Sequence, residues 1–187
     1  MTTVVSRVGE SGPRPDPDPA NDPLFDGLAL TESVDVTASA EAVYALVTDV
    51  TRIGELSPEC VRAEWVAEGV FEGTNRIASG DDEYLWVRPC TVVADEPGRH
   101  WAYVVGDKYD GTPATRWDWE MADNGDGTTT VTQTFSHLPH GLSGVRSQAD
   151  ADPANAAAVV AARVEVLRDG MRQTLARLRE AVQRSSA

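Results

Sequence analysis

The feature that most constrains this chain is an amphipathic stretch near its C-terminus, from Asn155 to about Arg184, which contains no proline. Its apolar residues follow one another in steps of three and four, which places their side chains on one stripe of an α-helix. They are Val160, Val164, Leu167, Met171, Leu175, Leu178 and Val182. Such a helix is roughly 40 Å long, so it crosses a small domain. Its apolar stripe requires a partner surface, which the chain from about Gly27 onward must supply.

Length and composition limit the class of protein. The chain has 187 residues, 41% of them hydrophobic, which is enough for one domain with a buried core. Its formal net charge of -14 argues against nucleic acid and anionic membrane surfaces as partners. No apolar run is long enough to span a bilayer, and no secretory signal is visible. Cys60 and Cys90 are expected to be reduced thiols, which predicts a cytoplasmic protein.

The first 26 residues are predicted to form a tail. Proline alternates with other residues from Pro13 to Pro19, and proline disfavours both helices and strand pairing. The segment also has little apolar surface to bury. We therefore expect residues 1–26 to be disordered and residues 27–187 to form the folded domain.

The middle of the chain alternates between polar and apolar residues, as strands with one buried face do. A first strand is expected at residues 28–36, followed by two short helices that Ser39 and Asp49 cap. Six further strands are predicted at residues 61–67, 73–78, 84–94, 99–105, 114–121 and 128–137. Glycine-containing turns between them favour hairpins. The pattern predicts an antiparallel meander, followed by a loop at residues 138–153 that leads to the long helix.

Alternation along the strands predicts which side chains face that helix. Residues 128–136 carry a hydroxyl at every second position, and a row of hydroxyls belongs in water. The intervening positions, and their equivalents on neighbouring strands, should therefore face inward. The large inward residues are Trp86, Trp101, Tyr103, Trp117, Trp119 and Phe135, and the inward polar ones include Arg88, Gln133 and His137. These rings either line a hollow for an apolar molecule or fill a solid core.

Several motifs of the chain resemble one known superfamily. They are Val34-Asp35-Val36, Ala38-Ser39-Ala40-Glu41-Ala42-Val43-Tyr44, Thr48-Asp49, Ile53-Gly54-Glu55-Leu56-Ser57-Pro58-Glu59-Cys60, Phe71-Glu72-Gly73-Thr74-Asn75-Arg76, Glu96-Pro97-Gly98-Arg99 and Gly170-Met171-Arg172-Gln173-Thr174-Leu175. Over residues 28–182 the chain is similar to the SRPBCC superfamily of START and Bet v1-like domains, of the polyketide cyclase/dehydrase and lipid-transport type. The resemblance implies an α+β helix-grip fold. In this fold a seven-stranded antiparallel sheet wraps around a long C-terminal helix, with two short helices after the first strand.

The same resemblance implies a cavity between sheet and helix that binds a small hydrophobic or aromatic molecule. Its expected lining is Trp86, Arg88, Trp101, Tyr103, Trp117, Trp119, Gln133, Phe135 and Met171. One alternative is a true cyclase or dehydratase, in which Arg88 and Tyr103 donate to an enolate and His137 shuttles a proton. Another is an interaction module whose hollow is filled by its own side chains.

The polar candidates also have ordinary structural explanations. Arg88 could pair with an acidic neighbour, Tyr103 could hydrogen-bond the backbone, and His137 could lie at the surface. Gly170 costs the long helix about 1 kcal/mol relative to alanine. It either opens space against the sheet or permits close packing.

No metal or cofactor is expected. His137 and His140 have the spacing of two ligands on one loop, but a third ligand is not evident. Phosphate-loop, dinucleotide-binding and nucleophile-elbow motifs are absent from the sequence. The expected partner is thus a small hydrophobic or aromatic molecule, without nucleic acid or membrane, and the protein is expected to be a monomer or homodimer.

Overall fold

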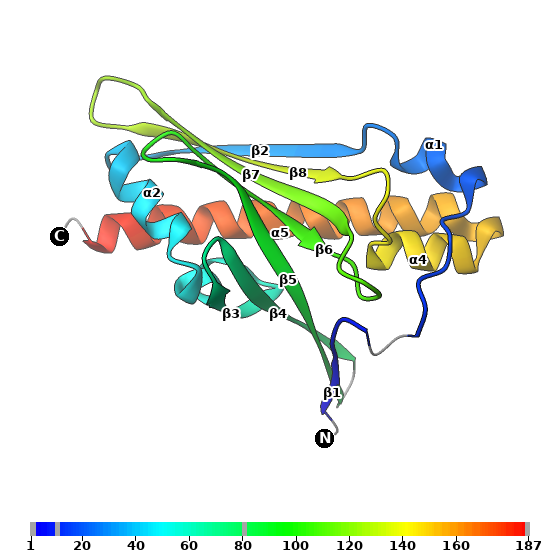
Figure 1. The fold of residues 1–187 in the computed structure, drawn as a ribbon. Helices are drawn as coiled ribbons and strands as arrows, with labels where there is room; N and C mark the ends of the chain where they lie inside the picture. Colours follow the sequence, from blue (N-terminus) through cyan, green and yellow to red (C-terminus); the bar gives the residue numbers. More distant parts are fainter. Residues whose placement is uncertain (1–2, 10–11, 80–81, 186–187) are drawn as a thin grey trace.

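A computed structural model, which describes residues 3–9, 12–79 and 82–185, shows a curved sheet gripping one long helix (Figure 1). The strands are β1 Thr3–Ser6, β2 Ala29–Val36, β3 Cys60–Ala67, β4 Val70–Ser79, β5 Asp82–Glu96, β6 His100–Gly106, β7 Pro113–Asp123 and β8 Thr129–His137. The α-helices are α1 Asp22–Phe25, α2 Ala40–Thr48, α3 Ile53–Leu56, α4 Gly144–Ala151 and α5 Ala156–Ser185. Short 3-10 turns precede three of them: η1 Pro19–Asn21, η2 Val50–Arg52 and η3 Pro153–Asn155.

The main sheet is antiparallel and has the strand order β2–β8–β7–β6–β5–β4–β3. Strands β3 to β8 form the meander, and β2 closes against β8. The predicted helix-grip α+β fold is therefore confirmed. The register sets Leu30 opposite Phe135, and Phe135 opposite Trp117, so that these apolar side chains share one face.

Two short helices follow β2, as the sequence predicts. The Ser39 Oγ accepts a hydrogen bond from the Ala42 N–H at 3.2 Å and so caps α2. The Asp49 carboxylate accepts one from the Thr51 N–H at 3.2 Å and caps the next turn. Val43 of α2 is completely buried in the main core cluster. The helices therefore close one end of the space between the sheet and α5.

The long helix α5 buries the predicted stripe. Its residues Val160, Leu167, Met171, Leu175, Leu178 and Val182 are buried, and Val164 is half-buried. In Figure 1, α5 runs alongside β2 and crosses the concave side of the sheet. Burying one such side chain contributes about 1.5–3 kcal/mol, so the stripe accounts for much of the force that holds helix and sheet together.

The prediction of a loop at residues 138–153 is wrong, because α4 occupies its centre. The Ser143 Oγ accepts a hydrogen bond from the Arg146 N–H and caps this helix. One turn further on, Arg146 Nε donates to Asp150 at 3.2 Å. Ala149 is fully buried in a cluster that includes residues of α1 and α5. The helix has so few apolar residues that no helical periodicity shows in the sequence.

The N-terminal segment also differs from the expected extended tail. Strand β1 pairs in parallel with the beginning of β5, setting Ser6 opposite Trp86. Phe25 of α1 is buried with Ala149 of α4. The guanidinium of Arg146, only 1% exposed, donates to Asp22 at 2.7 Å. Proline does not prevent these contacts, because they are made by side chains and by the short elements on either side of the proline-rich part.

Candidate functional site

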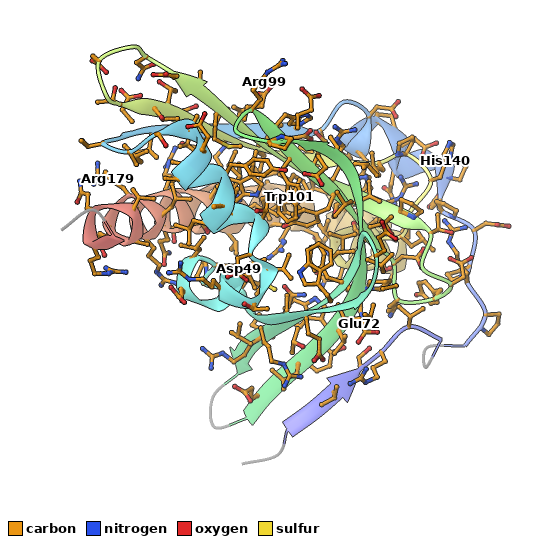
Figure 2. All side chains as sticks on the ribbon, turned by 60° about the vertical axis from the view of Figure 1, so that its left-hand side comes forward. Asp49, Glu72, Arg99, Trp101, His140 and Arg179 are labelled. Carbon is orange, nitrogen blue, oxygen red and sulfur yellow. The ribbon has the colours of Figure 1, made fainter. Side chains whose placement is uncertain are left out.

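The concave face of the sheet carries the side chains that the alternation predicts. On β8, Gln133 and Phe135 are buried on this face, whereas Thr134 between them hydrogen-bonds Thr31 on the convex face at 3.1 Å. Trp101 points into the space that the sheet and the helices enclose (Figure 2). The predicted inward and outward faces are therefore correct for these strands.

One part of this interior is closely packed. Trp101 and Trp119 are cross-strand neighbours with 3% and 5% of their surfaces exposed. They belong to one cluster with Met121 of β7 and with Leu175 and Leu178 of α5. We call these five residues the packed region. Here the aromatic rings fill a core, which was one of the two predicted alternatives.

In a second part of the interior the side chains are less completely buried. Trp117 faces inward between Tyr103 on β6 and Phe135 on β8, yet it is only half-buried. Val105 and Val164 on the same side are half-buried as well. Trp117 thus lies on the concave face, with a strand on either side of β7. We call Trp117, Val105 and Val164 the open region.

The corner between α3 and β3 lies against α5 near the open region. Glu59 accepts two hydrogen bonds from Arg163 of α5, at 2.7 and 2.8 Å. A Cβ on Gly170 would lie 3.6 Å from the Pro58 Cγ, which is ordinary contact. There is thus room for an alanine at position 170 and little more.

Two of the predicted lining residues lie apart from the rest. Trp86 and Arg88 are on the first half of β5, which extends beyond β6 and pairs with β1 and β4. Trp86 stacks on Tyr84, with ring centroids 5.7 Å apart. The structure brings the other seven predicted residues to the facing surfaces of sheet and α5. They are Trp101, Tyr103, Trp117, Trp119, Gln133, Phe135 and Met171.

The first candidate acid–base residue, Arg88, is held by backbone. Its Nη1 donates to the Val87 carbonyl at 2.7 Å and to the Ser6 carbonyl at 3.5 Å. Burial lowers the pKa of its guanidinium from the ordinary value. Within the described part of the chain it forms no ion pair, so the alternative of an acidic partner is not what the structure shows.

The second candidate, Tyr103, lies deep in the aromatic cluster. It is 7% exposed and packs edge-on against Phe71, with ring centroids 5.1 Å apart. Burial raises the pKa of its phenol well above the ordinary value of 10.0. The phenol therefore stays protonated at neutral pH and can act as a donor but not as a base.

The third candidate, His137, is buried and not at the surface. Its ring packs against Phe25, with centroids 4.6 Å apart, and its Nε2 lies 2.8 Å from the Ser143 Oγ. Burial, followed by the positive charge of Arg146, lowers the pKa of His137 from 6.5 to about 4. The imidazole is neutral at pH 7 and is covered by α1 and α4.

These three candidates do not converge on one point. Tyr103 and His137 are separated by β7 and by two residues along the strands, which places their backbones about 12 Å apart. Val92 of β5 pairs with Tyr103, and Arg88 lies four residues from Val92 along β5. The backbones of Arg88 and Tyr103 are therefore about 14 Å apart. General acid–base catalysis needs its groups within hydrogen-bond reach of the same reacting atoms. The positions therefore form no acid–base pair.

Two residues of this interior were not among the predicted lining residues. Phe71 of β4, 1% exposed, packs against both Trp101 and Tyr103. Glu32 of β2 interrupts the apolar alternation, yet it faces inward and its carboxylate accepts hydrogen bonds from Arg168 and Arg172 of α5. The sequence signal for Glu32 was its position among inward-facing residues of the first strand, together with the arginines on the long helix that could pair with it.

The surface hollow that the structure shows is not in the interior. Its volume is about 380 Å³, and it lies on the convex face near the turn between β5 and β6. The residues around it are mostly polar or charged: Glu96, Arg99, His100, Glu120, Met121, Ala122, Thr130 and Thr132. An apolar molecule does not suit such a lining, so this hollow is not the predicted cavity.

Clusters of metal-ligand residue types and long apolar helices are both absent from the part of the chain that is described. No cluster of three or more histidine, cysteine or acidic residues could hold a metal ion there. The H-x-x-H pair, His137 and His140, thus has no third ligand among the described residues. Cys60 and Cys90 are free thiols. None of the helices among these residues is both long and apolar enough to cross a membrane.

A family model described as "Polyketide cyclase / dehydrase and lipid transport" matches residues 28–183, which is most of the chain. A comparison with curated proteins gives no match. The match begins at the first strand of the main sheet and ends within α5, so it covers the sheet, the two short helices and the interior described above.

Solved structures show the same fold. A polyketide-cyclase-like protein from Corynebacterium glutamicum is 24% identical, with a TM-score of 0.59 over 84% of this chain and 92% of that one. The Zhui aromatase/cyclase from Streptomyces sp. R1128 is 15% identical, with a TM-score of 0.60 over 86% and 96%. A conserved protein from Geobacillus kaustophilus is 16% identical, with a TM-score of 0.61 over 84% and 97%. At these identities the likeness shows the fold alone.

Proposed function

Because the chain belongs to the polyketide cyclase/dehydrase and lipid transport family, we propose that it binds a small hydrophobic or aromatic molecule between its sheet and α5. The observation that carries the proposal is the half-buried Trp117 on the concave face. A large apolar ring that faces a protein interior and still contacts solvent is a surface that an apolar guest can cover.

The surroundings of Trp117 suit an aromatic guest. Its ring meets Phe135 edge-on, with centroids 5.1 Å apart, and it borders two of the three core clusters. Covering apolar surface is worth about 25 cal/mol per Å², and an added ring in edge or offset contact gains about 0.5–1.5 kcal/mol more. One structural neighbour is an aromatase/cyclase, which is consistent with an aromatic or polyketide-like guest.

The proposal includes a location and an assembly state. Two unbridged thiols, Cys60 and Cys90, fit the reducing cytoplasm. We propose a monomer or homodimer, because the apolar surface in question faces the interior. Light scattering of the purified protein measures the assembly state directly.

Fluorescence titration with 1-naphthol tests the binding proposal. We expect saturable binding that changes tryptophan emission, and at least tenfold weaker binding by Trp117→Ala. Thr134→Val on the convex face is the matched control and should bind as the wild type does. Native mass spectrometry of protein from its own host should show a retained small molecule. Saturating concentrations of 1-naphthol and naphthalene that leave the wild-type spectrum and melting curve unchanged would overturn the proposal.

A further inference from the structure

Gln133 is an unsatisfied polar residue inside an apolar interior. Its side chain is 5% exposed and lies on the concave face of β8. Among the described residues, no hydrogen-bond donor reaches its buried Oε1. Native proteins seldom leave a buried carbonyl oxygen without a partner, because the lost hydration is not recovered.

The residues next to Gln133 on the sheet give no hydrogen bond to its Oε1. Along β8 it lies between Val131 and Phe135, which have no polar side-chain atoms. Across the sheet it is opposite Trp119 on one side and Glu32 on the other. Glu32 is an acceptor that the two arginines of α5 already engage.

The position of Gln133 relates it to the open region. It lies two residues from Phe135 on the same face, about 7 Å along the strand. Phe135 in turn contacts Trp117. A two-ring molecule that lies on the Trp117 ring and points along the concave face past Phe135 can therefore bring a substituent at its inner end to the Gln133 amide.

We infer that Gln133 selects guests that carry a hydroxyl group, as a phenol or an enol does, by accepting a hydrogen bond from that group at Oε1. This inference rests on the proposed function, since it needs a guest in the interior. A guest that donates a hydrogen bond to the unpaired Oε1 binds more tightly than an analogue without the donor, because only the first guest satisfies the buried oxygen. Gln133 is therefore a specificity-determining residue for a hydroxylated aromatic molecule.

Three probes of nearly equal size test the inference by calorimetric titration. They are 1-naphthol, which can donate a hydrogen bond, 1-methoxynaphthalene, which only accepts one, and naphthalene, which does neither. The wild type should bind 1-naphthol at least tenfold more tightly than either of the other two. If 1-methoxynaphthalene or naphthalene binds as tightly as 1-naphthol, the inference is overturned while the proposed function stands. If none of the three binds, the proposed function fails and the inference falls with it.

Variants separate recognition from a structural role. Gln133→Leu should lose the preference for 1-naphthol, whereas Gln133→Glu, which keeps an acceptor, should retain it at a pH where the new carboxylate is ionised. The unfolding midpoint of ligand-free Gln133→Leu should equal or exceed that of the wild type, because the unsatisfied oxygen is removed. Thr134→Val should change neither the preference nor the midpoint. A Gln133→Leu protein that keeps the tenfold preference would contradict the inference. So would a clear loss of stability in ligand-free Gln133→Leu.

Discussion

Trp117 and Trp119 lie two residues apart on the same face of β7, yet they have different surroundings. Trp119 belongs to the packed region and is 5% exposed, whereas Trp117 belongs to the open region and is half-buried. Trp119 shares its cluster with Leu175 and Leu178 of α5 and with the buried residues of α2. Earlier on α5, Val164 is only half-buried, and Gly170 has no side chain to place against Pro58. One face of one sheet therefore buries one tryptophan almost completely and leaves part of the next one uncovered.

The largest expected effect comes from truncating the two tryptophans in turn. Trp119→Ala should lower the free energy of unfolding by about 3–5 kcal/mol, as expected when a large side chain leaves a packed core. Trp117→Ala should cost less than about 2 kcal/mol, because part of its ring is already in contact with solvent. Urea denaturation measures both. Equal losses for the two variants would remove the distinction between the packed and the open region.

The second effect concerns His137, which lies where α1 and α4 close the interior. Its pKa is lowered from 6.5 to about 4 on folding, chiefly by burial. Between these pH values the unfolded chain binds the proton more readily, so protonation favours unfolding. The corresponding stability, about 3 kcal/mol, is fully present above pH 6.5 and is lost as the pH falls toward 4.

Denaturation curves measured between pH 4 and pH 7 test this effect. His137→Gln removes the titrating ring but keeps a side chain that can hydrogen-bond Ser143, and it should flatten the pH dependence in this window. The control Thr134→Val should keep the wild-type slope. If His137→Gln keeps that slope as well, the end of the interior at α1 and α4 is more open than the structure indicates.

A smaller effect is expected at position 170 of α5. Gly170→Ala should raise the free energy of unfolding by about 0.5–1 kcal/mol, because alanine favours the helix and its Cβ would meet Pro58 in ordinary contact at 3.6 Å. Thermal denaturation measures the gain. Destabilisation by this methyl group would show that the open region is more tightly packed than Trp117 suggests.

The smallest effect is expected from the ion pair between Glu59 and Arg163. Both side chains are about one-third exposed, at 32% and 33%, so solvent screens their attraction. Arg163→Gln should change the free energy of unfolding by less than about 1 kcal/mol. Stopped-flow release of 1-naphthol should be faster in the variant, if the pair limits movement of the α3–β3 corner. An unchanged release rate would mean that the ion pair does not control access to the open region.

Local patterns in the sequence were enough to predict most of the fold. The apolar stripe of the last helix, the hydroxyl row of the last strand and the cap at Ser39 each depend on residues near one another in the chain. These features predicted α5, the inward face of β8 and the start of α2. They could be read from the sequence because helical and strand periodicities are set by the backbone alone.

The rest depended on contacts between distant parts of the chain. Helix α4 forms although few of its residues are apolar, because Arg146 binds Asp22 and Asp18 of the N-terminal segment. The pairing of β1 with β5 likewise joins residues far apart in the sequence. For the candidate site, alternation predicted that Trp117 and Trp119 face inward, but their different burial depends on what α2 and α5 place opposite them.

The buried guanidinium of Arg146 has a consequence for where a shortened version of this protein can begin. A chain starting at residue 28, where the family match begins, would still contain the sequence of α4. It would lack three groups that the guanidinium contacts: the Asp22 carboxylate, the Asp18 carbonyl and the Phe25 ring. A cation would then remain in an apolar setting with Asp150 as its one remaining partner among those contacts. We expect α4 to unfold in such a truncated chain. The unit that folds therefore extends upstream of the segment that defines the family.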